Sequence, residues 1–382
     1  MRIHLHLSSL LGGLLCLSLA NKDSAWTTEV PVDTTGNGRP VLNASFASAE
    51  TGISERLYAL PDLGFLLQTK QAAGIQLGLT RQGRRVNAWY FPGTSDKKAL
   101  VIGGMHGSEL SSIEVAQALV EELLMQEEKP YYSVIVIPSL FPDNAATAMK
   151  VPEQAGSVLN IGRYTHDNAV DPNRQMPSPG KDFDDEQMTD HLHRSIEKEN
   201  QLLLQLIRLY KPDRVANVHA IRNTSYGGIY ADPRTDEKGI ALGYATDSSL
   251  AVDMAIAVAQ RHGNVAGNRL DKRPTALYYK DPVPAPKGFL QKRNTVGSAL
   301  KAHRGSGISM GTWGTTAVKD DTDSSRNRNA MRVITIEVPG AKRSFDYKNP
   351  QQQRIFRQQV LAFMHSIHEV FLGEKHVETG SN

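Results

Sequence analysis

Residues 99–109 read ALVIGGMHGSE, an apolar run followed by two glycines and the start of a helical segment. The run from Ala99 to Gly103 predicts a strand with both faces buried, because no polar residue interrupts it. The glycines end that strand, and an amphipathic pattern from Ser111 to Gln126 predicts the helix that follows. A buried strand that leads directly into a helix is typical of α/β proteins.

The same alternation of short and long apolar patterns continues along the chain. Further β-branched runs predict strands at 86–91, 133–138, 214–218, 228–231 and 332–338, and amphipathic patterns predict helices at 192–210, 250–262 and 352–372. We therefore expect an α/β fold with a mixed, mostly parallel central sheet and helices on both faces.

The first 20 residues have the pattern of a signal peptide. Arg2 is their only formal charge, residues 10–19 form an apolar core too short to span a bilayer, and small residues precede a cleavage point after Ala20. We expect an exported protein, periplasmic or secreted, with residues 21–54 as a flexible polar lead-in. Cys16 is the only cysteine of the chain, and a lipoprotein modified at this residue is an alternative. It is less favoured, because the residues just before Cys16 are not the small ones usual before a lipid-modified cysteine.

Residues 55–375 are expected to form one domain. The 43 basic and 40 acidic residues give a formal net charge of +3, so charge does not indicate a nucleic-acid partner. No later apolar run approaches the ~20 residues of a membrane helix. Two stretches interrupt the α/β alternation, a proline- and lysine-rich one near 278–301 and an almost entirely polar one at 319–328, and both predict long inserted surface loops.

The first candidate site residues are His106 and Glu109, directly after the strand that begins at Ala99. A spacing of three places two side chains on the same side of a helical turn, so both can converge on one ion. The alternative is a capping histidine beside a glutamate that the helix dipole stabilises.

Asn173 and Arg174 form a second candidate pair, in the proline-bounded turn Asp171-Pro172-Asn173-Arg174. A guanidinium group binds a carboxylate through two parallel hydrogen bonds, and the adjacent amide adds a directed donor. The alternative is a solvent-facing turn in which Arg174 pairs with any nearby acid.

His219 follows a predicted strand, and Glu337 is embedded in the apolar run 332–338. A buried carboxylate is costly, and burial raises its pKa toward the range useful for general-base catalysis. His219 could join His106 and Glu109 as a third ligand of one metal ion. Two imidazoles and one carboxylate leave a zinc ion a net positive charge and an open position, which lowers the pKa of a bound water to roughly 7. A structural histidine and an interior salt bridge are the alternatives.

The order of these motifs resembles the zinc carboxypeptidase family, of which carboxypeptidase A is typical. The resemblance extends from about Ala99 to Pro339 and implies a carboxypeptidase-like domain that binds one zinc ion and hydrolyses a C-terminal peptide bond. It implies the zinc ligands His106, Glu109 and His219, a catalytic base Glu337, an arginine Arg163 that polarises the scissile carbonyl, and Asn173 and Arg174 as holders of the substrate's free C-terminal carboxylate. Glu337 would activate the zinc-bound water and later protonate the leaving amine.

Three alternatives remain open at the level of function. Exported bacterial relatives of the family trim peptidoglycan, which suggests muropeptides as substrates besides ordinary peptides. An aspartoacylase-like deacylase of N-acyl amino acids would share several of the motifs. A non-catalytic peptide-binding protein would keep the fold but lose a ligand or the base, whereas this chain has all four. Tyr226 and Tyr230 are candidates for the tyrosine that closes over the substrate in the digestive enzymes.

Overall fold

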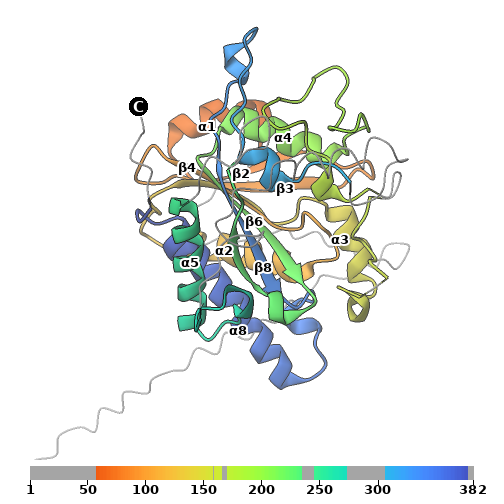
Figure 1. Cartoon of the computed structure of the whole chain (residues 1–382), viewed down its shortest axis with the longest axis vertical. Helices are drawn as coiled ribbons and strands as arrows, with labels where there is room; N and C mark the ends of the chain where they lie inside the picture. The colour runs from red at the N-terminus through yellow and green to blue at the C-terminus, as the bar shows by residue number, and fades with distance from the viewer. Residues whose placement is uncertain (1–56, 158, 166–169, 235–244, 273–305, 377–382) are drawn as a thin grey trace, which may run out of the picture. The chain divides into compact units, whose positions relative to one another are not determined.

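The computed structural model describes residues 57–157, 159–165, 170–234, 245–272 and 306–376 (Figure 1). All of them belong to one compact unit, Glu50–Asn382. The predicted signal peptide, the polar lead-in 21–54 and the predicted loop 278–301 lie outside the described residues.

One eight-stranded sheet forms the centre of this unit, in the order β1-β2-β3-β5-β4-β6-β8-β7. β4 pairs in parallel with β5 and with β6, and β6 pairs in parallel with β8. Three pairings are antiparallel: β2 with β3, β3 with β5, and β7 with β8. The strands are β1 (Tyr58–Ala59), β2 (Ala73–Leu79), β3 (Arg85–Phe91), β4 (Lys98–Ile102), β5 (Ser133–Ile137), β6 (Arg214–Ile221), β7 (Gly228–Ala231) and β8 (Arg332–Pro339).

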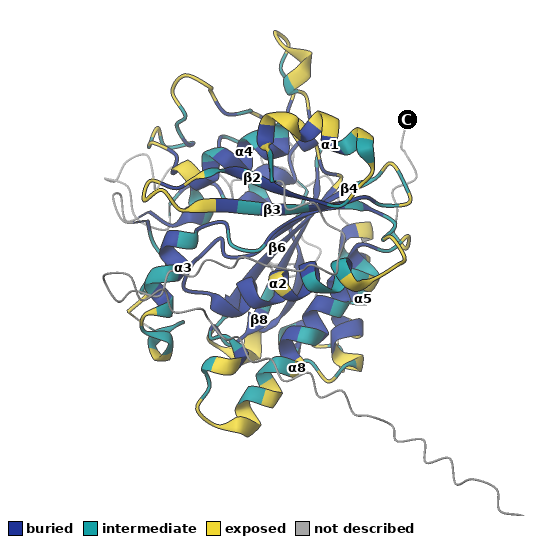
Figure 2. Ribbon diagram, turned by 180° about the vertical axis from the view of Figure 1, so that it is seen from behind, coloured by how far each residue is buried: buried dark blue, intermediate teal, exposed yellow. Residues whose placement is uncertain are grey.

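Helices cover both faces of the sheet (Figure 1). One face packs against α2 (Leu110–Met125), α5 (Ala245–Gln260) and α8 (Pro350–Ser366), and the other against α1 (Leu63–Thr69), α4 (Lys198–Tyr210) and α7 (Met310–Gly314). Side chains alternate along β4, so Ala99 and Val101 join the first core and Leu100 and Ile102 the second. The central strands β4, β5, β6 and β8 are buried along most of their length (Figure 2). The predicted α/β class, with a mixed, mostly parallel sheet, is confirmed.

Short helical elements complete the described chain. They are α3 (Pro142–Met149), a final π-helical turn η8 (Ile367–Phe371), and the 3-10 turns η1 (Leu60–Asp62), η2 (Pro152–Gln154), η3 (Pro172–Arg174), η4 (Thr224–Tyr226), η5 (Ala266–Asn268), η6 (Ser324–Arg326) and η7 (Ser344–Asp346). The predicted loop 319–328 contains η6, and backbone hydrogen bonds between Val318 and Arg328 close its base. No helix in the described ranges combines the length and apolarity needed to cross a bilayer.

Several predicted boundaries were wrong. The helix predicted from residue 192 begins at Lys198, because the carboxylate of Asp190 accepts hydrogen bonds from the backbone N–H groups of Leu192 and Arg194 and holds this segment in a turn. β2 was not predicted, since its two glycines weaken the strand pattern. β6 continues to Ile221 beyond the predicted end, so His219 lies inside the strand rather than after it.

Candidate metal and substrate site

The candidate metal ligands and Glu337 lie on or directly after three neighbouring strands of the parallel part of the sheet. His106 and Glu109 follow β4, whereas His219 and Glu337 lie near the carboxyl ends of β6 and β8 and pair directly in register. Parallel strands place their carboxyl ends at one edge of the sheet, which is where ligands bind in α/β proteins. Residues that are distant in the sequence are thereby brought to one place.

A tight turn, rather than a helical face, makes His106 and Glu109 converge. The backbone N–H of Glu109 donates to the carbonyl of His106 at 3.0 Å, and α2 begins only at Leu110. Between them, Gly107 packs against α3 so closely that an added Cβ would lie 2.3 Å from the backbone nitrogen of Ala145. Only glycine fits at this position, so α3 fixes the turn that presents both side chains.

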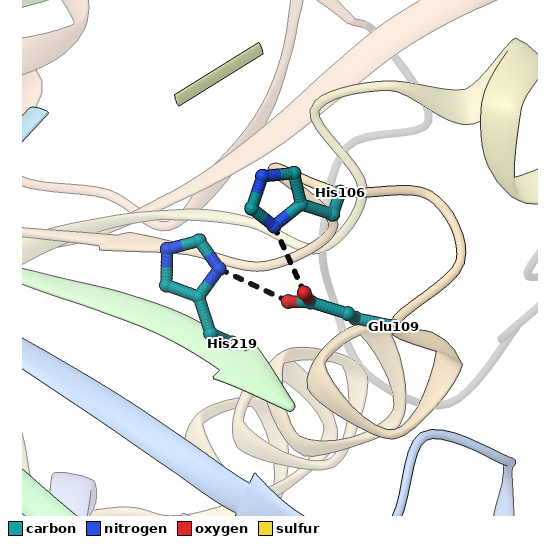
Figure 3. Close-up of side chains that lie close together, drawn as sticks. All are labelled: His106, Glu109 and His219. Carbon is teal, nitrogen blue, oxygen red and sulfur yellow. Dashed lines mark hydrogen bonds and ion pairs between the residues drawn. The ribbon is translucent and has the colours of Figure 1, made fainter. Parts of the chain in front are cut away.

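The three predicted zinc ligands form one buried cluster (Figure 3). One potential ligand atom from each of His106, Glu109 and His219 lies within 4.8 Å of the others. Nδ1 of His106 lies 2.9 Å from Oε1 of Glu109, and Nδ1 of His219 lies 3.0 Å from Oε2 of the same carboxylate. Two imidazole nitrogens and one carboxylate therefore lie close enough together to hold one metal ion.

Outer hydrogen bonds orient this cluster. Nε2 of His106 lies 2.7 Å from Oδ1 of Asp171, and the backbone N–H of Ala220 donates to Oε2 of Glu109 at 3.0 Å. Asp171 was not predicted as a site residue, although it stands in the same turn as Asn173 and Arg174. A carboxylate that accepts the Nε2 proton leaves the Nδ1 lone pair free to bind a metal ion.

The electrostatics of the cluster follow from burial and from close opposite charges. Burial alone would lower the pKa of His106, but the carboxylates of Glu109 and Asp171 raise it to about 9. Burial lowers the pKa of His219, which favours its neutral form. Although burial opposes it, contact with both histidines holds the pKa of Glu109 well below its usual value, so this carboxylate is ionised.

Asn173 and Arg174 lie beside the cluster in η3. The amide nitrogen of Asn173 lies 3.3 Å from Nε2 of His219, and its Oδ1 accepts from the backbone N–H of Met310 at 2.9 Å. Arg174 donates through one terminal nitrogen to the carbonyl of Asn173, whereas its Nε is buried and has no hydrogen-bond partner in the described structure. The guanidinium group therefore retains one buried donor that no described residue uses.

Arg163 lies between the cluster and Asp171. One terminal nitrogen is 2.6 Å from Oε1 of Glu109, and the other is 3.6 Å from Oδ2 of Asp171. The side chain of Arg163 is 29% exposed and lines a cavity beside the cluster. Its guanidinium group at the same time pairs with Glu109, a predicted metal ligand.

Glu337 lies on the wall of the same cavity. Its carboxylate forms no ion pair or hydrogen bond with the other residues that the structure describes, which argues against the salt-bridge alternative. Burial, and then the negative charge of Glu109, raises the pKa of Glu337 to about 8. A carboxylate with this pKa can accept and release a proton near neutral pH.

One cavity of about 550 Å³ connects all the candidate residues. His106, Glu109, Arg163, Asn173, Arg174, His219 and Glu337 line it, together with Ser108, Asp232, Gly311 and Thr335. Sequence reasoning missed Asp232, because no motif marks a single acid that follows a short strand. Neither Tyr226 nor Tyr230 is among the described residues that line the cavity.

Comparisons with known proteins identify similar folds at low sequence identity. No family model and no curated protein matches the chain. The murein-tripeptide amidase of Escherichia coli O157 is 14% identical, over 78% of this chain and 92% of that one, with a TM-score of 0.41. The carboxypeptidase A of Helicoverpa armigera is 13% identical, over 81% and 73% of the two chains, with a TM-score of 0.42.

A metallo-carboxypeptidase from Burkholderia cenocepacia is also similar, with 13% identity over 80% of this chain and 66% of that one and a TM-score of 0.41. These solved structures are of the class that the motifs of this chain resemble. At such identities and TM-scores the similarity determines neither the activity nor the substrate of this chain.

Proposed function

We propose that this protein is a zinc-dependent metallocarboxypeptidase that hydrolyses the last peptide bond of a substrate with a free C-terminal carboxylate. One observation carries the proposal. The buried cluster of His106, Glu109 and His219, whose ligand atoms lie within 4.8 Å of one another, shares a cavity with the carboxylate of Glu337 and the guanidinium of Arg174. A metal site, a proton carrier and a carboxylate receptor are thus adjacent.

The residues of the cluster fit a zinc ion. Each imidazole directs Nδ1 at the carboxylate of Glu109, and the outer hydrogen bond from His106 to Asp171 fixes the required tautomer. A bound zinc ion would supply a Lewis acid for the scissile carbonyl and a lowered pKa for a water molecule.

Glu337 is assigned the proton transfers. It would take a proton from the attacking water and deliver it to the departing amine, and its raised pKa suits both steps. Arg163 is assigned the stabilisation of the negative charge that develops on the carbonyl oxygen. In this role its guanidinium group would contact both that oxygen and Glu109, with which it pairs in the structure.

Asn173 and Arg174 are assigned the free carboxylate at the substrate's end. The unused Nε donor of Arg174 supports this assignment, because a buried guanidinium nitrogen without a partner gains free energy from an anionic ligand. Binding this carboxylate would align the last peptide bond with Glu337, so that cleavage releases one residue.

We propose that this reaction takes place outside the cytoplasm, and muropeptides are among the candidate substrates.

The test compares three substrates with and without a chelator. The zinc-loaded protein is incubated with a peptide that ends in a free carboxylate, with the same peptide ending in an amide, and with N-acetylaspartate. We expect release of the last residue from the first substrate alone, and loss of that activity when the metal is removed.

Two outcomes of this experiment contradict the proposal. Turnover of N-acetylaspartate without action on the peptides indicates an aspartoacylase-like deacylase. Saturable binding of the free-carboxylate peptide without cleavage, although zinc is bound, indicates a binding protein.

A further inference from the structure

A second arginine holds the turn that presents Asn173 and Arg174. Nη2 of Arg194 donates to the carbonyl of Arg174 at 2.8 Å and to the carbonyl of Ser306 at 2.9 Å. The side chain of Arg194 is 12% exposed, and it is not among the described residues that line the cavity. Arg194 therefore contacts the backbone of a proposed substrate-binding residue from outside the cavity.

A buried carboxylate fixes the orientation of Arg194. Nε of Arg194 donates to Oδ2 of Asp190 at 2.6 Å, and the side chain of Asp190 is fully buried. The other oxygen of Asp190, Oδ1, accepts hydrogen bonds from the backbone N–H groups of Leu192 and Arg194. Because a guanidinium group is planar, a partner at Nε also determines where the terminal nitrogens point. Asp190 thereby directs Nη2 of Arg194 at the two carbonyls.

A neighbouring chain segment closes on the same contact. An added Cβ at Gly307 would lie 2.1 Å from the carbonyl oxygen of Arg174 and 2.7 Å from Nη2 of Arg194. Gly307 also has a φ of +123°, which favours glycine. Farther along this segment, the backbone N–H of Met310 donates to Oδ1 of Asn173 at 2.9 Å. The segment is therefore packed against both residues of the pair, and Arg194 joins it to the turn.

The position of this turn determines where the guanidinium group of Arg174 lies. One terminal nitrogen of Arg174 donates to the carbonyl of Asn173 at 2.5 Å, so the side chain is tied to the backbone of the turn. Nε of Arg174 is the buried donor that the proposed function assigns to the substrate's carboxylate. A displacement of about 1 Å in a substrate-positioning group can slow a reaction by on the order of 100-fold.

We propose that Arg194 is a positioning residue for the substrate's C-terminal carboxylate and acts through the backbone of Arg174. This inference rests on the proposed carboxypeptidase function and adds a residue to it. Arg194 sets the affinity for the carboxylate end of the substrate without contacting the substrate. It leaves the candidate metal site unchanged, because the hydrogen bonds that orient that cluster do not involve Arg194.

Arg194→Lys tests this role with a conservative change. Lysine keeps a positive charge beside Asp190, but its single nitrogen cannot serve the carboxylate and both carbonyls in the geometry of a guanidinium fork. For a peptide with a free C-terminal carboxylate, we expect KM to rise by on the order of 10-fold while kcat stays within about threefold of wild type. Bound zinc should equal that of the wild-type protein.

Arg208→Lys is the matched control for this variant. Arg208 is 19% exposed, pairs through Nε with Asp182 at 2.6 Å and donates to the carbonyl of Phe183 at 2.8 Å, so its contacts resemble those of Arg194. Arg208 is not among the described residues that line the cavity, and its KM should be that of wild type. Comparison of the two variants separates a loss of positioning from a general loss of stability.

Gly307→Ala disturbs the same contact from the opposite segment. The added methyl group presses on the carbonyl of Arg174, so this variant should raise KM in the same direction as Arg194→Lys. It keeps the inference testable if Arg194→Lys does not fold.

A double-mutant cycle tests whether Arg194 acts through Arg174. Arg194→Lys should lower kcat/KM by on the order of 10-fold in the wild-type background. In an Arg174→Ala background the same change should lower kcat/KM by less than about twofold, because the group that Arg194 positions is gone.

The possible failures are distinguishable. If the zinc-loaded wild-type protein cleaves no peptide with a free carboxylate, the proposed function is wrong and the inference falls with it. If the wild-type protein cleaves such peptides, three results overturn only the inference: a wild-type KM in Arg194→Lys, an equal rise of KM in Arg208→Lys, or an undiminished effect in the Arg174→Ala background.

Discussion

At the scale of single residues, the site depends on carboxylates in contrasting environments. Glu109 contacts two imidazoles and Arg163, which keeps it ionised, whereas Glu337 has no such partner and its pKa rises to about 8. The same functional group is thus suited to the proposed metal ligand in one place and to the proposed proton carrier in the other.

Glu337→Gln should separate catalysis from metal binding. The amide keeps the shape of the side chain but cannot accept the proton, so we expect kcat to fall by about 10²- to 10⁴-fold while bound zinc is unchanged. Rate measurements and metal analysis of the purified variant are the readouts.

His219→Ala is the comparison for that variant, because it removes a proposed ligand and should lose zinc as well as activity. A Glu337→Gln protein with wild-type turnover would show that another group carries the proton.

At the scale of elements, α4 begins beside a cluster of acids. Glu199, in its first turn, is 6% exposed, and burial together with the neighbouring charges of Asp143 and Glu197 raises its pKa to about 7. This carboxylate is therefore harder to ionise in the folded protein than in the unfolded chain, where the ordinary value of 4.5 applies.

Glu199→Gln should stabilise the protein at alkaline pH. Because the folded-state pKa lies above the unfolded one, the wild-type protein loses stability as the pH rises from about 4.5 to about 7, and the uncharged glutamine avoids that loss. We expect a thermal midpoint about 2–4 °C higher than wild type at pH 8 and nearly equal midpoints at pH 5.

The exposed Glu186, changed to glutamine, is the control for this effect and should leave the midpoint within about 1 °C of wild type. An equal gain for both variants, or a gain for Glu199→Gln that does not depend on pH, would contradict the burial argument.

At the scale of the whole molecule, the candidate metal site joins the turn after β4 to β6. A ligand that binds only the folded state raises its stability, by about 2.7 kcal/mol when its free concentration is 100 times Kd. We expect zinc to raise the thermal midpoint of the chelator-treated protein by about 5 °C or more, as measured by calorimetry.

The zinc-dependent shift should disappear in His219→Ala, whose midpoint in chelator serves as the baseline. Midpoints of the wild-type protein that are the same in zinc and in chelator would show that the cluster does not bind the metal in solution.

The sequence predicted much of the fold because its strands are continuous apolar runs. β4, β5 and β8 lie within one residue of the predicted ranges, since burial on both faces leaves an uninterrupted pattern. The start of α4 could not be predicted, because the competing turn depends on hydrogen bonds to the side chain of Asp190. Local propensity does not report such side-chain competition.

The sequence by itself determined the α/β class, which depends on local apolar patterns, and indicated the candidate metal ligands through the order of its motifs. Only the tertiary structure decided that His106, Glu109 and His219 meet, that Asp171 orients one of them, and that Asp232 shares their cavity. The physical reason is the parallel pairing of β4, β6 and β8, which brings distant segments to one edge of the sheet.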